Sequence, residues 1–241
     1  MNGVSVTPEF LAIGLVWYIV FLLSTTAHEA SHALVAKLGG DPTAFHGGQV
    51  SLDPLPHIRR EPFGMVLFPI LSYIMGGWMM GWASAPYDPL WEQQHPRRAA
   101  WMALAGPAAN FTLAVIAGIA IHAGILMGVF KSPESISFVR IVDAVASGGA
   151  ADGVAKFLSL LFSLNVLLGT FNLLPVPPLD GYSVLGLFAT ENGARRLQQW
   201  RQSARMFTFI GLLLSWQMFG YLYGPIFSVA LKVLYPGASY G

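Results

Sequence analysis

The sequence predicts an all-α polytopic membrane protein. We expect about four to six transmembrane helices and a re-entrant or short β-strand element near residues 45–86. Only 10% of the 241 residues are charged, whereas soluble domains carry roughly 25%. Hydrophobic residues make up 54% of the chain. Such a chain cannot cover its own surface with polar groups, so a bilayer is needed as the apolar solvent. We expect residues 1–241 to form a single integral membrane domain.

Apolar runs give the order of the expected helices. The runs cover residues 10–38, 63–85, 99–130, 154–174 and 206–235. No Lys or Arg precedes the first run, so it lacks the basic start of a cleaved signal peptide and is expected to be retained. The second run contains Pro69 and several glycines, which disfavour one straight helix. The last run, a C-terminal helical segment, is expected to break at Gly224-Pro225.

Charge and cysteine content exclude several function classes. The formal net charge is +1, which gives no electrostatic basis for binding nucleic acid. The chain has no cysteine, so any transition metal must be held by His, Asp or Glu. The polar stretches between the apolar runs are too short for a PDZ module or a nucleotide-binding domain.

The strongest chemical signal is His28-Glu29-Ala30-Ser31-His32, near the end of the first apolar run. This is the H-E-x-x-H pattern of zinc metallopeptidases. Four residues on a helix advance by about 400°, so His28 and His32 share one face and can bind one metal ion. Glu29 lies on the adjacent flank. Ionisable groups in an apolar membrane helix are costly and usually functional, so these residues predict a metal site.

Asp180 is the best candidate for a third ligand. A catalytic zinc takes three protein ligands and keeps one position open. Pro178-Leu179-Asp180-Gly181 is also a common turn pattern, but here it directly follows an apolar span. The prolines at positions 175, 177 and 178 stop the helix and leave the backbone extended, which would let the carboxylate point sideways.

Together these motifs resemble the site-2 protease family of intramembrane zinc metalloproteases, in its compact bacterial and archaeal branch without PDZ or CBS domains. The resemblance covers roughly residues 9–185, which would hold the metal-binding core. It is carried by the H-E-x-x-H pattern, by Gly106-Pro107-x-x-Asn110, by Asn172 and by the Pro-Pro-Leu-Asp-Gly stretch that ends at Gly181.

The resemblance implies an enzyme that hydrolyses peptide bonds in or near transmembrane segments of membrane proteins. It implies one zinc ion per chain, bound by His28, His32 and Asp180, with Glu29 as general base for a zinc-activated water. It also implies that Asn172 and Asn110 line the cleft and hold substrate or oxyanion. The partners would be membrane-protein substrates and the lipid bilayer, in a prokaryotic cell membrane. Substrate identity and oligomeric state do not follow from the sequence.

Two other functions remain open at this point: a membrane metal transporter, and a non-catalytic protein that grips membrane segments. A protease would need an edge strand to hold an unwound substrate, and residues 45–52 and 81–86 are candidates. Four further histidines receive no catalytic role: His46, His57, His95 and His122. Four arginines are interpreted as a membrane-surface segment: Arg195, Arg196, Arg201 and Arg205.

The ligand positions also predict the topology. For Asp180 to meet the histidines, the first and fourth runs must end at the same face, so the third run is the return helix. The second run then enters and leaves by that face, which holds nine basic residues against four on the other. The nine are Lys37, Arg59, Arg60, Arg97, Arg98, Arg195, Arg196, Arg201 and Arg205, and the four are Lys131, Arg140, Lys156 and Lys232. The positive-inside rule therefore predicts a zinc site nearer the cytoplasmic face and an N-terminus outside.

Overall fold

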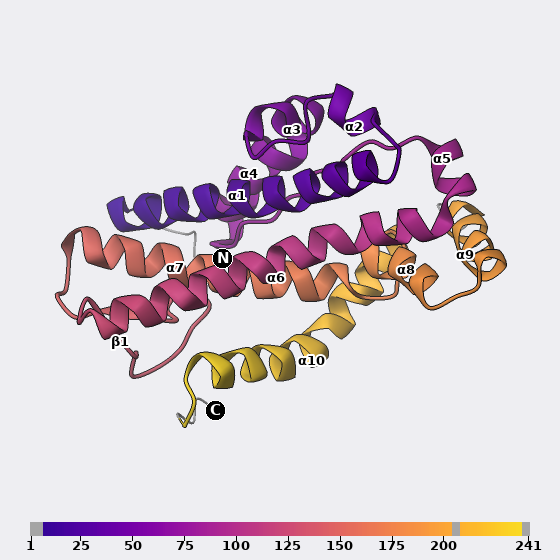
Figure 1. Ribbon diagram of the computed structural model, residues 1–241. Helices are drawn as coiled ribbons and strands as arrows, with labels where there is room; N and C mark the ends of the chain where they lie inside the picture. Colours follow the sequence, from indigo (N-terminus) through magenta and orange to yellow (C-terminus); the bar gives the residue numbers. More distant parts are fainter. Residues whose placement is uncertain (1–6, 204–207, 238–241) are drawn as a thin grey trace.

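Three long helices form the centre of the protein (Figure 1). The computed structural model describes residues 7–203 and 208–237. The three are α1 (Pro8–Leu38), α6 (Pro96–Leu126) and α7 (Gly149–Asn172). Each is long and apolar enough to cross a bilayer, and in the described part of the chain no other helix meets both criteria. Apolar side chains such as Val20, Ile121 and Leu160 are buried where the helices meet. The predicted all-α membrane fold is confirmed.

Shorter elements connect and flank these helices. In chain order they are α2 (Thr43–His46), α3 (Pro54–Arg60), the π-helical turn η1 (Phe63–Leu67), α4 (Phe68–Gly76), α5 (Pro89–Gln94), β1 (Phe130–Lys131), β2 (Asp143–Ala144), α8 (Asp180–Val184), the 3-10 turn η2 (Leu185–Leu187), α9 (Glu191–Ser203) and α10 (Thr208–Leu234). The antiparallel pair β1 and β2 places Phe130 opposite Ala144 and Lys131 opposite Asp143.

The central helices alternate in direction. In Figure 1 the C-terminal end of α1, the N-terminal end of α6 and the C-terminal end of α7 lie at the same end of the molecule. Two hydrogen bonds join the end of α1 to this region: Trp91 Nε1 donates to the Gly39 carbonyl at 3.0 Å, and Arg98 Nη1 donates to the same oxygen at 3.1 Å. The third apolar run is therefore the return helix, as predicted.

The second apolar run enters and returns on one side. Its two ends meet, since Ser84 Oγ donates to Glu61 Oε1 at 2.6 Å. Its tip reaches the start of α1, where Tyr73 Oη donates to the Phe10 carbonyl at 2.8 Å. Residues 63–76 of the run are helical, as η1 and α4. Residues 77–85, which lead back from the tip, have no assigned helix or strand. Residues 45–86 are all described and contain no assigned strand, and the second run leaves beside the point where it enters, as the re-entrant alternative requires.

Neither candidate edge strand, residues 45–52 or residues 81–86, is paired as a strand, and the two stretches differ in structure. Residues 45–52 form the end of α2, a turn at residues 47–48 and a bend at residues 50–52, and Gly48 in the turn has a positive φ of 74°. Residues 81–86 belong to neither a helix nor a strand. This return segment packs closely on the turn η1 and on α1: Trp82 N donates to the Gly64 carbonyl at 3.1 Å, and a Cβ on Gly81 would lie 2.5 Å from the Phe21 ring of α1.

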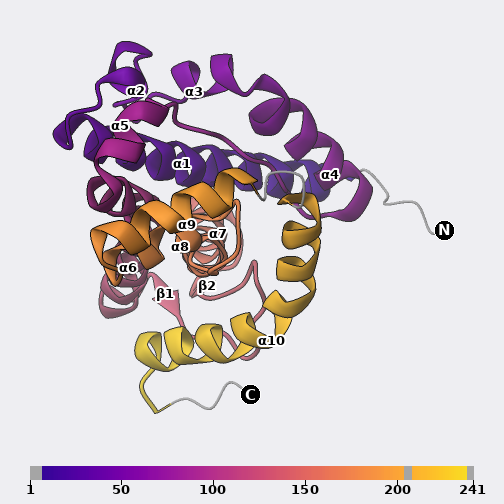
Figure 2. The ribbon, with the colours of Figure 1, turned by 90° about the vertical axis from the view of Figure 1, so that its right-hand side faces the viewer.

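The last helix, α10, bends instead of breaking. The sequence predicts an interruption at Gly224-Pro225, but helical structure continues from Thr208 to Leu234 with Pro225 inside it. Proline lacks the N–H and clashes with the preceding turn, which kinks a helix without ending it, and the bend is visible in both ribbon views (Figures 1 and 2). Residues 206 and 207 of this predicted run lie outside the described residues.

Candidate metal centre

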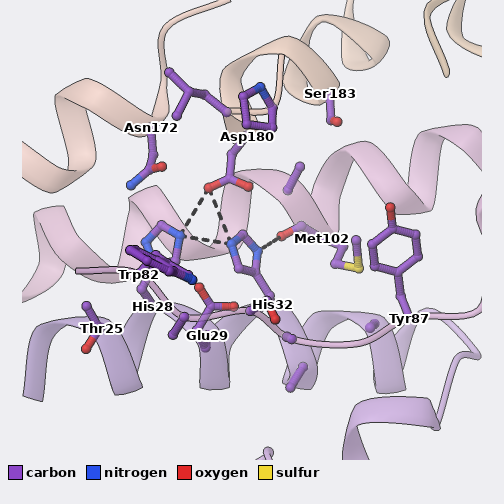
Figure 3. A pocket seen from close by; sticks show the side chains of 18 of the residues that line it. Thr25, His28, Glu29, His32, Trp82, Tyr87, Met102, Asn172, Asp180 and Ser183 are labelled. Carbon is purple, nitrogen blue, oxygen red and sulfur yellow. Dashed lines mark hydrogen bonds and ion pairs between the residues drawn. The ribbon is translucent and has the colours of Figure 1, made fainter. Parts of the chain in front are cut away.

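The two histidines of the H-E-x-x-H pattern lie one helical turn apart on α1 and face α6 and α8 (Figure 3). Both are buried. Their Nε2 atoms are 3.0 Å apart, as expected for residues i and i+4 on one face. The helical spacing alone therefore brings two imidazole nitrogens to one point.

Asp180 completes the group from the other side. It is the first residue of α8, and its Oδ2 lies 3.1 Å from His28 Nε2 and 3.4 Å from His32 Nε2. Gly181 permits this approach, because a Cβ there would lie 2.5 Å from the Leu174 carbonyl oxygen, and closer still to the carbonyl of Leu173. Only a residue without a side chain lets α8 fold back against the end of α7 and present the carboxylate to α1.

Hydrogen bonds to the outer ring nitrogens define the histidine tautomers. His28 Nδ1 lies 2.6 Å from Asn110 Oδ1, and His32 Nδ1 lies 2.7 Å from the Met102 carbonyl. Both partners are oxygen acceptors, so each Nδ1 carries the proton and donates it. Each Nε2 therefore keeps its lone pair and directs it toward Asp180. Such outer-ring hydrogen bonds are typical of metal-binding histidines.

These donors fit a zinc ion. Zinc–nitrogen bonds of about 2.0–2.1 Å in tetrahedral geometry separate two ligand atoms by roughly 3.4 Å. The three separations among His28 Nε2, His32 Nε2 and Asp180 Oδ2 are 3.0, 3.1 and 3.4 Å. Two neutral imidazoles and one carboxylate are also a donor set that zinc prefers.

Glu29 lies beside this group and supplies a second carboxylate. It is buried, and its carboxylate and the two histidine rings offer ligand atoms within 4.8 Å of one another. Glu29 and Asp180 can therefore both reach the centre. The closer contacts of Asp180 to both Nε2 atoms favour it as the ligand and leave Glu29 available for proton transfer.

The centre opens into a cavity of about 820 Å³. Its walls come from α1, the return segment, α5, α6, the end of α7, the loop at residues 177–179, α8, α9 and α10. The polar lining residues are Thr25, His28, Glu29, His32, Ser84, Tyr87, Glu92, Asn172, Asp180, Ser183 and Arg201. Asn172 lines the cavity as predicted, and its Nδ2 donates to the Leu168 carbonyl at 3.0 Å. A cavity of this size can admit an extended peptide segment as well as water.

Asn110 has a different place from the one expected. It is 0% exposed and does not line the cavity, because its side chain lies behind His28 and is engaged in hydrogen bonds. It cannot contact a substrate in this arrangement. The four remaining histidines, His46, His57, His95 and His122, are also absent from the lining.

Asp41 anchors the far end of the return segment that forms one cavity wall. Its Oδ2 accepts from Asp88 N at 2.8 Å, and its Oδ1 accepts from Thr43 N and Oγ1 at 3.0 and 2.5 Å. Burial alone would raise the pKa of Asp41, but these hydrogen bonds stabilise the carboxylate and bring the pKa below its usual value.

A buried ion pair at the rim was not predicted from the sequence. Arg201 of α9 pairs with Glu92 of α5 and donates to Tyr87 Oη and Ser183 Oγ, both at 3.0 Å. Arg201 therefore points into the protein and belongs to the cavity rim, a contact that the interpretation as part of a basic surface segment did not include. The cause is the amphipathic character of α9, whose other basic residues Arg195 and Arg196 are exposed. Nothing in the local sequence distinguishes Arg201 from them. Arg205 lies outside the described residues.

Gly106 provides the space in which the imidazoles sit. A Cβ built on it would lie 2.5 Å from His28 Nε2 and 2.6 Å from His32 Cε1, and closer still to His32 Nε2. The rings cannot retreat without losing their bonds to Asn110 and Met102. The motif Gly106-Pro107-x-x-Asn110 thus places both a gap and a ring acceptor on one face of α6.

We therefore expect Gly106→Ala to lower the zinc content of the purified protein, because the added methyl group occupies the place of the donor atoms. The measurement is zinc per chain by elemental analysis. Gly118→Ala on the same helix is the matched control, since its Cβ would meet its nearest neighbour at 3.4 Å, an ordinary contact. Equal zinc in wild type and Gly106→Ala would contradict this view of the site.

Known proteins resemble this chain over most of its length. The profile of peptidase family M50 matches residues 16–216. A Bacillus subtilis (strain 168) protein named "Putative zinc metalloprotease YwhC" is 31% identical over 168 residues, which cover 69% of this chain and 66% of that protein. Rip2 of Mycolicibacterium smegmatis, with the same description, is 32% identical over 168 residues, covering 68% and 54% of the two chains.

The Rip2 protein of Mycobacterium tuberculosis (strain H37Rv) is 29% identical over 207 residues, which cover 86% of this chain and 70% of the relative. The matched part thus spans between about half and two thirds of the first two relatives. No solved structure is significantly similar to this chain.

Proposed function

Because this chain belongs to peptidase family M50, the site-2 protease family that its motifs resemble, we propose that it is an intramembrane zinc metalloendopeptidase. It would hydrolyse peptide bonds in or near transmembrane segments of other membrane proteins. The observation that supports this most strongly is the meeting of His28 Nε2, His32 Nε2 and Asp180 Oδ2 in a cavity that Glu29 also lines. Strong ligands that gather at one depth suit catalysis better than transport along a path.

The proposed mechanism assigns a separate role to each polar residue. Zinc, when bound by the two histidines and Asp180, supplies a Lewis acid that polarises the scissile carbonyl and acidifies water. Glu29 accepts the proton of the attacking water and later delivers it to the leaving amine. Asn172 has one amide N–H engaged by Leu168, so its second N–H can stabilise the oxyanion of the tetrahedral intermediate.

The substrate must present an unwound peptide bond. A transmembrane helix satisfies its carbonyls internally, so they are not accessible to attack until it opens locally. The return segment at residues 81–86 is free of helical structure and lines the same cavity as Glu29. Its backbone groups would hold an unwound substrate by strand addition.

Removal of the metal tests the proposed function. We expect the purified wild-type chain to contain one zinc ion and to cleave a reporter membrane protein in detergent or proteoliposomes. A chelator should abolish cleavage, and added zinc should restore it, because Glu29 alone, without a Lewis acid, is too weak a base to activate water. Cleavage that continues in fully zinc-depleted protein would contradict the proposal. Zinc transport into proteoliposomes without any cleavage would favour a transporter instead.

The proposed orientation puts the metal centre nearer the cytoplasm. Positive-inside counting places the end of α1, the return segment and α9 on the cytoplasmic side. We expect Ser135→Cys, in the loop between β1 and β2, to react with a membrane-impermeant thiol reagent in intact cells, while Gln94→Cys in α5 is protected. The chain has no cysteine of its own, so labelling reports one site at a time. The reverse pattern would overturn the orientation.

A further inference from the structure

A buried hydrogen-bond network connects the metal centre to α7. It consists of Ser24 on α1, Asn110 on α6 and Asn165 on α7, and all three residues are 0% exposed. Asn110 Nδ2 donates to Asn165 Oδ1 at 2.8 Å and to the Ser24 carbonyl at 3.3 Å. Asn165 Nδ2 donates to Ser24 Oγ and to the Leu161 carbonyl, both at 2.8 Å. Every amide N–H of the two asparagines is used.

The polarity of this network follows from the Leu161 carbonyl, which can only accept. The atom of Asn165 that faces it must therefore be the amide nitrogen, and the oxygen of Asn165 must face Asn110. The nitrogen of Asn110 then faces Asn165, and its oxygen faces His28 Nδ1. The Ser24 carbonyl independently requires the same orientation of Asn110, since it too can only accept.

The opposite orientation would be incompatible with metal binding. A reversed Asn110 amide would donate to His28 Nδ1 and move the ring proton to Nε2, which lies 3.1 Å from Asp180 and 3.0 Å from His32 Nε2. The reversal would also bring the Asn110 oxygen against the Ser24 carbonyl and the Asn165 oxygen. The network therefore selects the tautomer in which His28 Nε2 is free to bind metal.

We propose that Asn165 is a positioning residue of the metal centre. Together with Ser24 it orients the Asn110 amide, and through Asn110 it sets the tautomer of His28. The inference rests on the proposed function, since it concerns the zinc site assigned there. Asn165 lies on α7 and is not among the residues that line the cavity. It is connected to the ligand His28 through Asn110.

The test is zinc affinity in an Asn165→Ala variant, measured by titrating metal-free protein against a competing chelator. Loss of outer hydrogen bonds to metal-binding histidines typically weakens binding about 10–100-fold, and we expect a change in that range. Ser163→Ala is the matched control, because Ser163 is also on α7 and 0% exposed, but its hydroxyl has no hydrogen-bond partner in the described structure. Its zinc affinity should equal that of wild type.

A double-mutant cycle separates positioning from a merely structural role. If Asn165 acts through Asn110, then Asn110→Ala combined with Asn165→Ala should bind zinc within about twofold of Asn110→Ala alone. If the two substitutions caused independent packing defects, their losses of zinc affinity would add. Additive losses, or wild-type affinity in Asn165→Ala, would overturn the proposal.

A second variant and a second measurement cover the case in which Asn165→Ala does not fold. In Asn165→Ser the hydroxyl can still donate to the Leu161 carbonyl in the manner common for serine in helices, but it is too short to reach Asn110. Nitrogen NMR of labelled His28 in metal-free protein should show the Nδ1–H tautomer in wild type and a mixture in this variant. An unchanged tautomer would refute the proposal. If wild type binds no zinc, the proposed function fails, while the tautomer measurement still decides the role of Asn165.

Discussion

Glu29→Gln is expected to abolish proteolysis while zinc stays bound. Gln has the same shape as Glu but cannot accept a proton at neutral pH, so the attacking water loses its base. Positioned general bases contribute about 10²–10⁴-fold to rate, and we expect a fall in kcat of that size. The carboxylate of Glu29 reaches the same point as the two histidines but is not needed as a ligand when Asp180 provides one.

The measurement is cleavage rate together with zinc per chain for the same preparation. Glu9→Gln is the matched control, since Glu9 is on the same helix but exposed near its start, far from the cavity. It should behave as wild type. A Glu29→Gln variant that cleaves at nearly the wild-type rate would show that another group takes the proton.

Asp180→Ala is expected to lose zinc and activity together. Removal of an outer hydrogen bond typically costs about 10–100-fold in metal affinity, so removal of a direct ligand should cost more than about 100-fold. In the variant, His28 Nε2 and His32 Nε2 would no longer face a carboxylate. We expect metal-depleted protein after dialysis against a mild chelator that leaves wild type loaded.

Asp152→Ala serves as the control for this change. Asp152 forms an ion pair of 2.7 Å with Lys156 at the start of α7, far from the cavity lining, and its side chain is 38% exposed. Exposed pairs contribute little to stability, so this variant should keep its zinc. Stoichiometric zinc in Asp180→Ala under the same dialysis would remove Asp180 from the ligand set.

Much of the architecture follows from local sequence. Helix periodicity places His28 and His32 on one face, and the structure confirms the antiparallel arrangement of the three central helices that the position of Asp180 requires. The re-entrant path of the second run was one of two predicted alternatives. This path is held by the hydrogen bonds from Tyr73 to Phe10 and from Ser84 to Glu61. Each bond joins residues that are far apart in the sequence, so no local pattern predicts it.

The role of Asn110 illustrates the limit of sequence patterns. Its spacing from Gly106 puts both residues on one face of α6, and that much is local geometry. Whether the amide points into the cavity or behind the ring depends on partners contributed by other helices, Ser24 and Asn165. The same holds for Arg201, which turns inward because Glu92 of α5 lies within reach.

By itself, then, the sequence determined the membrane class, the order of the helices and the pair of candidate metal donors on α1, because composition and helical period act within one element. Only the tertiary structure decided which side chains stand behind those donors and which form the cavity rim. A buried polar group must find its partner wherever packing offers one, and in this protein the partners of Asn110 and Arg201 come from helices whose relative placement no local pattern encodes.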